Sequence, residues 1–229
     1  MPIKSEYPEL PLTRTLPRFA GDPAPTTTTT SNSSDSRPSV IEQVKLGIAS
    51  VAKSFTIDMW LARHTPQTVL PRLHKIITSI KEEYADCDGL YAAGYCFGAK
   101  YVLLLAGDMD KDVVQGERAP EAKAEEGMVK EGPAIKCGVI AHGTSILKED
   151  MEGCKVPVSV VAVEQDTLFP DDVREAGKKA LEEKGVEHEV EVYPGVPHGF
   201  AVLGDYEDGK IVEAQQKAFT QMLGWLKAH

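Results

Sequence analysis

The distribution of apolar and polar positions predicts strands and helices that alternate along most of the chain. Apolar residues recur at helical spacing in segments 39–55, 64–84 and 210–229. Segment 99–107 is predicted as a buried helix, and 170–185 as a helix with aspartates at its start, lysines toward its end and Gly185 as its stop. Short apolar runs predict strands within segments 90–98, 134–145, 156–169 and 187–200. From residue 90 onward the predicted order is strand, helix, strand, strand, helix, strand, helix. This order is typical of an α/β protein with a mostly parallel sheet flanked by helices.

Two segments depart from this pattern. Residues 1–38 are rich in Pro, Thr and Ser and poor in apolar side chains, so we expect an irregular or flexible N-terminal segment. Residues 107–134 are charged and contain glycine, which predicts an excursion on the surface. Residues 39–229 then form one folded domain, which is long enough to bury a core.

The amino-acid composition indicates which kinds of partner and which cellular compartment to expect. The chain carries 25 Lys and Arg residues against 35 Asp and Glu residues, a formal charge of -10, and shows no basic stripe. Neither nucleic acid nor a membrane is therefore expected as a partner. The first residues lack the apolar run of a signal peptide, and the four cysteines form no CxxC pair or metal-binding pattern. These features predict a cytoplasmic protein without a metal.

The residues Gly94-Tyr95-Cys96-Phe97-Gly98 follow a predicted strand and precede a predicted helix. In a parallel α/β sheet, ligands bind outside the carboxyl ends of the strands, and a sharp turn there presents a side chain to them. A G-x-nucleophile-x-G pattern is typical of this turn, because strand and helix approach so closely that small residues are needed on both sides. Cys96 stands at the nucleophile position, where the helix N-terminus favours a thiolate and the N–H of Phe97 could donate to an oxyanion. The alternative is a buried structural cysteine between two packing glycines.

A nucleophilic thiol requires a base, and the base requires an acid that orients it. In this architecture the acid and the histidine follow the nucleophile in that order, each after a strand. Asp166 follows the valine-rich strand, and His198 lies in the loop after the next strand. We therefore predict a catalytic triad of Cys96, His198 and Asp166. Asp171 and Asp172 are less favoured acids, because they stand at the start of a helix that they could cap.

Aromatic and histidine side chains are the candidates for a substrate pocket. Trp60, Phe97 and Phe200 could wall an apolar pocket, although core packing explains Trp60 and Phe200 equally well. His142 closes a predicted strand and either lines the pocket or is an ordinary buried histidine. The remaining histidines and cysteines are expected to be structural or exposed: His64, His74, His188, His229, Cys87, Cys137 and Cys154.

Three blocks of the sequence resemble the dienelactone hydrolase family, particularly its fungal members. These blocks are GYCFGAKYVLLLAG, VEQDTLFP and PGVPHGFAVLGD. With the stretches upstream of Cys96, the resemblance covers roughly residues 20 to 228. It implies the α/β-hydrolase fold and a triad in which Cys96 is the nucleophile, His198 the base and Asp166 the orienting acid.

Two departures from that family bear on the expected function. Family members carry several strands before the segment GDPAP, where this chain has only 20 residues, so we expect an N-terminally truncated sheet of four strands with an exposed edge. In the family, those strands contribute the second oxyanion donor and a glutamate that interacts with the resting thiol. Bacterial members also carry an arginine four positions after the triad histidine, where this chain has Val202. That difference suggests a less anionic ester as substrate.

The expected function is the hydrolysis of a small ester or lactone through a thioester acyl-enzyme, which requires no cofactor. The alternative is a catalytically impaired α/β-hydrolase remnant that binds a ligand or a partner. A homo-oligomer is a further possibility under this alternative, since a second polypeptide could complete the sheet. Redox sensing through Cys96 is a third hypothesis.

Overall fold

The structure, a computed structural model, describes residues 59–110, 130–202, 204 and 206–229. All of these residues belong to one compact unit within Val51–His229. The irregular segment predicted at 1–38 and the helix predicted at 39–55 lie outside the described residues, as does most of the excursion predicted at 107–134.

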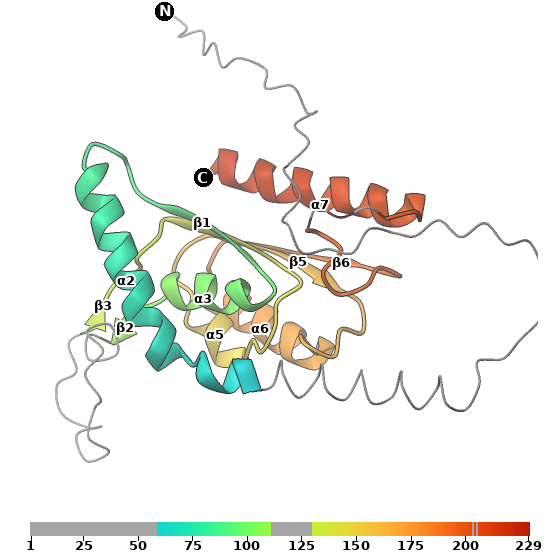
Figure 1. The fold of residues 1–229 in the computed structure, drawn as a ribbon, viewed down its shortest axis with the longest axis horizontal. Helices are drawn as coiled ribbons and strands as arrows, with labels where there is room; N and C mark the ends of the chain where they lie inside the picture. Colours follow the sequence, from blue (N-terminus) through green and yellow to red (C-terminus); the bar gives the residue numbers. More distant parts are fainter. Residues whose placement is uncertain (1–58, 111–129, 203, 205) are drawn as a thin grey trace, which may run out of the picture. The chain divides into compact units, whose positions relative to one another are not determined.

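A four-stranded sheet lies at the centre of this unit (Figure 1). Its strands are β1 (Tyr91–Tyr95), β4 (Cys137–Ala141), β5 (Val158–Val163) and β6 (His188–Tyr193), and they lie side by side in the order β1-β4-β5-β6. All three pairings are parallel, so the carboxyl ends of the four strands meet at one edge of the sheet. The predicted strands and their parallel direction are confirmed.

In the described part of the chain, the helices that connect or flank these strands include α2 (Pro66–Glu83), α3 (Phe97–Leu105), α5 (Lys148–Glu152), α6 (Asp171–Glu183) and α7 (Gly209–Ala228). Residues 59–63 are helical as well. The sequence pattern did not predict α5, because five residues are too few to show helical periodicity. It lies in the crossover that the parallel strands β4 and β5 require. The short strands β2 (Met109–Asp110) and β3 (Lys130–Glu131) form a separate antiparallel pair at the two ends of the predicted excursion.

Helices cover both faces of the sheet, with α3, α5 and α6 on one face and α7 on the other (Figure 1). Alternate side chains of β4 show this division, since Ile140 packs in the cluster that contains α3, whereas Val139 and Ala141 pack against α7. Every position of β4 and β5 is buried as a result. This explains why both strands read as continuous apolar runs.

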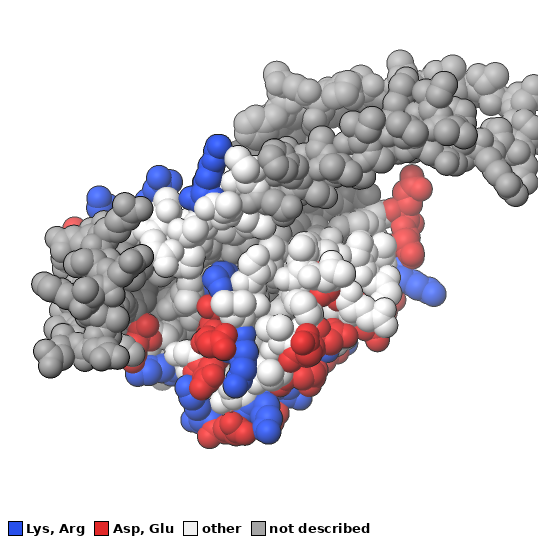
Figure 2. All heavy atoms as spheres, turned by 90° about the horizontal axis from the view of Figure 1, so that it is seen from below, with Lys and Arg blue, Asp and Glu red and all other residues white. Residues whose placement is uncertain are grey.

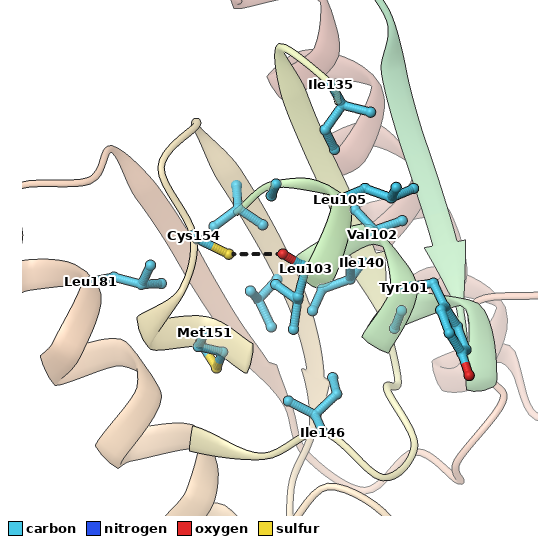
Figure 3. Packing of buried hydrophobic residues seen from close by; sticks show 14 of the residues in the cluster. Tyr101, Val102, Leu103, Leu105, Ile135, Ile140, Ile146, Met151, Cys154 and Leu181 are labelled. Carbon is cyan, nitrogen blue, oxygen red and sulfur yellow. Dashed lines mark hydrogen bonds between the residues drawn. The ribbon is translucent and has the colours of Figure 1, made fainter. Parts of the chain in front are cut away.

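The larger of the two clusters joins α3, α5 and α6 (Figure 3). Leu103, Met151 and Leu181, one from each of these helices, are fully buried in it. Cys154 lies beside Leu103, and its thiol donates a hydrogen bond to the Leu103 carbonyl oxygen over 3.7 Å. Burial raises the pKa of this thiol to about 12, in line with the structural role that the sequence suggests for it.

Acidic and basic side chains are interspersed on the face that Figure 2 shows. Ion pairs at helical spacing join Lys148 to Glu152 on α5, and Lys178 to Glu182 on α6. A face of mixed sign attracts a polyanion such as nucleic acid only weakly. None of the helices in the described part of the chain is long and apolar enough to cross a membrane.

Candidate active site

Cys96 occupies the turn between β1 and α3, directly before the first residue of the helix. Its φ of 50° lies in the left-handed region, which costs a non-glycine residue about 1–3 kcal/mol. A Cβ atom added to Gly94 would lie 2.6 Å from the carbonyl oxygen of Gly98 and 2.7 Å from Cγ2 of Val102, so strand and helix are as close there as predicted. The expectation that Gly98 must also be small is wrong, because a Cβ atom on it would meet no described residue within 4 Å.

Replacing Gly94 with alanine is expected to lower the free energy of unfolding by about 1–3 kcal/mol, since the new methyl group overlaps the backbone of α3. Gly98→Ala is the matched control. It should leave stability unchanged or raise it by up to about 1 kcal/mol, because alanine favours the helix and finds open space. Equilibrium unfolding in urea measures both variants. Equal midpoints for the two would contradict the close approach of β1 and α3.

Three side chains from separate loops meet at the carboxyl edge of the sheet. Cys96 follows β1, Asp166 follows β5 and His198 follows β6. Nε2 of His198 lies 3.4 Å from Sγ of Cys96. Nδ1 of His198 lies 2.7 Å from Oδ2 of Asp166. The structure therefore brings together the three residues that the sequence predicts as a triad.

The carboxylate of Asp166 is held in a defined orientation. Its side chain is 3% exposed, and its Oδ1 accepts a hydrogen bond from the N–H of Leu168 over 2.9 Å. Its other oxygen faces His198. A carboxylate at Nδ1 favours the tautomer that carries a proton on this nitrogen, which leaves Nε2 able to accept a proton from the thiol.

Backbone strain is concentrated at the same edge. In the described part of the chain, the non-glycine residues with a positive φ are Cys96, His142, Ser145 and Gln165. Each of them follows the carboxyl end of β1, β4 or β5. Such conformations persist only where surrounding contacts impose them, and they cluster at functional sites. The strain therefore points to this edge independently of the triad.

Phe97 is the first residue of α3. Its backbone N–H has no acceptor within the helix, as is general for the first turn. The N-terminal end of α3 also carries the positive end of the helix dipole. An N–H donor and a favourable potential for negative charge therefore adjoin Cys96.

The rival acids and thiols have other surroundings. Asp171 and Asp172 occupy the first turn of α6, where Asp171 forms an ion pair with Arg174 at 2.5 Å. Cys137 is buried like Cys154, and burial raises the pKa of its thiol.

Among the residues described, no group of three or more His, Cys, Asp or Glu side chains is arranged to hold a metal ion.

Thr144 lies beside Cys96 and His198, and the sequence pattern did not predict it. Its Oγ1 lies 3.1 Å from Sγ of Cys96 and 3.4 Å from Nε2 of His198. Threonine three residues past a strand is too common to be a signal by itself. The geometry of the folded chain is what identifies it.

His142, predicted either to line the pocket or to be an ordinary buried histidine, is 1% exposed. Its ring lies edge to face with the ring of His198, with centroids 5.1 Å apart. Neither ring nitrogen finds a hydrogen-bond partner within the described ranges. Burial, followed by the proximity of His198, lowers the pKa of His142 from 6.5 to about 4, so the ring is neutral at neutral pH.

The shifted pKa of His142 is expected to make the fold less stable in mild acid. Because the folded-state pKa is lowered, the unfolded chain binds a proton at this residue where the folded chain does not, so stability falls from pH 6.5 down to about 4. The free energy of unfolding should be about 2 kcal/mol smaller at pH 5 than at pH 7 through this residue. Urea unfolding at both pH values measures the effect. His142→Phe, which binds no proton, should lose this part of the pH dependence, and an unchanged dependence would contradict the assignment.

Trp60 lies next to Phe97, with ring centroids 4.6 Å apart in an edge-on arrangement, and it stacks on His64 at 4.0 Å. Trp60 is 45% exposed. Phe200, by contrast, is fully buried in the cluster beneath α7. Trp60 therefore packs beside Phe97, the residue after Cys96. The pocket roles of Trp60, His142 and Phe200 stay predictions.

Comparison with known families supports the resemblance seen in the sequence. Residues 126–229 match the sequence profile of the dienelactone hydrolase family. These residues belong to the dienelactone hydrolase family. Asp166 and His198 lie within the matched residues, and Cys96 precedes them.

Two curated fungal proteins are similar to this chain over a longer stretch. Hydrolase tropI of Talaromyces stipitatus is 30% identical over 168 residues, which are 72% of this chain and 56% of that protein. Dienlactone hydrolase 1 of Gibberella moniliformis is 25% identical over 177 residues, 76% of this chain and 58% of that protein. The chain therefore spans less than two thirds of the length of these relatives.

The fold agrees with that of a solved bacterial structure. A crystal structure from Klebsiella pneumoniae, assigned as a dienelactone hydrolase, superposes with a TM-score of 0.54 at 18% identity. The match covers 74% of this chain and 64% of the other. The predicted α/β-hydrolase fold class is thereby confirmed.

Proposed function

We propose that this protein hydrolyses a small carboxylic ester or lactone through a thioester formed on Cys96. The observation that carries the proposal is the continuous contact from sulfur to imidazole to carboxylate, with distances of 3.4 and 2.7 Å. Membership of residues 126–229 in the dienelactone hydrolase family supports it. In this proposal Cys96 is the nucleophile, His198 the base and Asp166 the orienting acid.

The first half of the reaction acylates the sulfur. The thiol proton of Cys96 passes to Nε2 of His198, and the thiolate attacks the carbonyl carbon of the ester. The N–H of Phe97 and the N-terminal end of α3 stabilise the negative charge that develops on the carbonyl oxygen. The imidazolium then gives its proton to the leaving oxygen as the carbon–oxygen bond breaks, which leaves a thioester.

The second half returns the enzyme to its starting state. His198 takes a proton from a water molecule, and the resulting hydroxide attacks the thioester carbon. The thiolate leaves, the carboxylic acid is released, and the imidazolium returns its proton to the sulfur. Asp166 stabilises the imidazolium in both halves. With a lactone, the leaving oxygen stays attached to the acyl group, so one hydroxy acid is the product.

The surroundings of the triad favour an ester without a second negative charge. Val202, which is 47% exposed, stands four residues after His198, at the position of the arginine that bacterial dienelactone hydrolases use for a substrate carboxylate. The ring of Trp60 lies edge-on to that of Phe97, the residue next to Cys96 in the chain. We therefore propose an uncharged, partly apolar acyl group.

Trapping of the acyl-enzyme tests the proposal. The protein is mixed briefly with p-nitrophenyl acetate, quenched in acid, digested and analysed by mass spectrometry. An acetyl group on the peptide that contains Cys96, with none on the peptide of the exposed Cys87, is the expected result. A folded protein without acetyl on Cys96 would contradict the proposal and favour a ligand-binding α/β-hydrolase remnant.

A further inference from the structure

Thr144 lies in the loop between β4 and α5, with 4% of its surface exposed. Its hydroxyl oxygen is 3.1 Å from Sγ of Cys96 and 3.4 Å from Nε2 of His198, while these two atoms are 3.4 Å from each other. The three atoms therefore form a nearly equilateral triangle. A hydroxyl in this position contacts both groups between which the proton of the proposed reaction moves.

A buried hydroxyl normally hydrogen-bonds to backbone or water, as most polar side chains do. The hydrogen-bond partners that the structure gives to Oγ1 of Thr144 are instead the thiol and the imidazole. A hydroxyl carries one proton and two lone pairs, so it can donate to sulfur while it accepts from the nitrogen. The arrangement suits a thiolate next to an imidazolium, since both interactions then involve a charged group.

The backbone around Thr144 is attached to the loops that carry the triad. The N–H of Thr144 donates to the carbonyl oxygen of Cys96 over 3.1 Å, and the N–H of Ser145 donates to the carbonyl oxygen of Leu168 over 3.1 Å. Leu168 in turn donates its own N–H to Asp166. The loop of Thr144 is therefore bonded to both the nucleophile turn and the acid loop.

A buried ion pair holds the other side of this loop. Lys100, one helical turn after Cys96, contacts Asp150 of α5 at 2.5 Å, and both side chains are almost fully buried. Lys100 also donates to the carbonyl oxygen of Ser145 over 3.0 Å, and Asp150 accepts from the N–H of Leu147 over 2.7 Å. These contacts hold the backbone that follows Thr144.

We propose that Thr144 is a further catalytic residue, whose hydroxyl donates a hydrogen bond to the Cys96 thiolate and so stabilises the thiolate–imidazolium pair with His198. The step is a proton transfer from sulfur to Nε2, and the hydroxyl keeps its own proton throughout. The inference rests on the proposed function, because it assigns Thr144 a part in activating the same nucleophile.

The experiment compares two pairs of variants that differ at residue 144 mainly by the hydroxyl. Thr144 and Thr144→Val have similar shapes, and Thr144→Ser and Thr144→Ala share a smaller one. The rate of alkylation of Cys96 by iodoacetamide is measured against pH, with peptide mass spectrometry to separate the cysteines. Cys87, which is exposed, serves as a reference thiol in every sample. Circular dichroism confirms the fold of each variant.

Loss of the hydroxyl should raise the pH of half-maximal alkylation of Cys96 by about one unit, so the rate at neutral pH falls about tenfold. We expect this shift in Thr144→Val and Thr144→Ala but not in Thr144→Ser, and no shift for Cys87. The Ser and Ala pair decides the question if Thr144→Val does not fold. Identical profiles within each pair, or an equal shift in Thr144→Ser, would overturn the proposal, because packing would then explain the contacts.

The outcome is independent of ester hydrolysis. Alkylation reports the thiolate of Cys96 whether or not an acyl-enzyme forms on it. A shift in the pH profile without any trapped acyl group would therefore support the role of Thr144 and contradict only the proposed reaction. Acyl trapping with no shift would do the reverse.

Discussion

Replacing Cys96 with alanine is expected to lower kcat for a small ester by a factor of about 10⁵–10⁶. Without the sulfur no thioester can form, and His198 can at best assist a direct attack by water. The residual rate would come from the N–H donors at the start of α3 and from substrate binding, which do not depend on the sulfur. Hydrolysis of p-nitrophenyl acetate by the purified variant, compared with the wild-type chain, measures the loss.

The matched control for Cys96→Ala is Cys87→Ala. Cys87 is an exposed thiol after α2, away from the strand ends that carry the triad, so its removal should leave kcat unchanged. If Cys96→Ala kept a tenth or more of the wild-type kcat, the nucleophile would have to be another group. Equal losses in the two variants would point to a general effect of cysteine removal.

Replacing Asp166 with asparagine is expected to lower kcat by a factor of about 10⁴ with little change in KM. The carboxylate accepts from Nδ1 of His198 over 2.7 Å and from the N–H of Leu168 over 2.9 Å. An amide of the same shape can still accept from Leu168, but its NH₂ group favours the wrong tautomer of His198. The geometry stays intact while Nε2 loses its ability to accept the thiol proton. Steady-state kinetics with a chromogenic ester measures the effect.

Asp172→Asn is the matched control, because Asp172 is the exposed rival acid in the first turn of α6. The same chemical change there should leave kcat within a factor of about two, since no contact with His198 is removed. Circular dichroism separates loss of function from loss of fold. A larger loss in Asp172→Asn than in Asp166→Asn would reverse the assignment of the orienting acid.

Much of this architecture could be predicted because the two central strands are buried on both faces. Continuous apolar runs at β4 and β5 and helical periodicity at α6 and α7 report directly which positions face the core. The parallel direction of the strands then places Cys96, Asp166 and His198 at one edge, even though 102 positions separate the first from the last. The rule that ligands bind at the carboxyl ends of parallel strands supplied this placement.

Other features could not be predicted from the spacing of apolar and polar residues. The helix α5 is too short for periodicity, and Thr144 has no neighbours in sequence that mark it. Gly98 looked equivalent to Gly94, yet only at Gly94 does the backbone of the facing element leave no room for a side chain. The burial of His142 against His198 likewise depends on how neighbouring strand ends meet.

The amino-acid sequence by itself determined the alternation of strands and helices, the strained turn at Cys96 and the order of nucleophile, acid and histidine, because these are encoded in local spacing. The contacts of Thr144 with the sulfur and the imidazole, and the neutral state of His142, depend on the folded chain. They arise from contacts between residues far apart in sequence, whose distances are set by strand order and loop conformation, and periodicity carries no information about either.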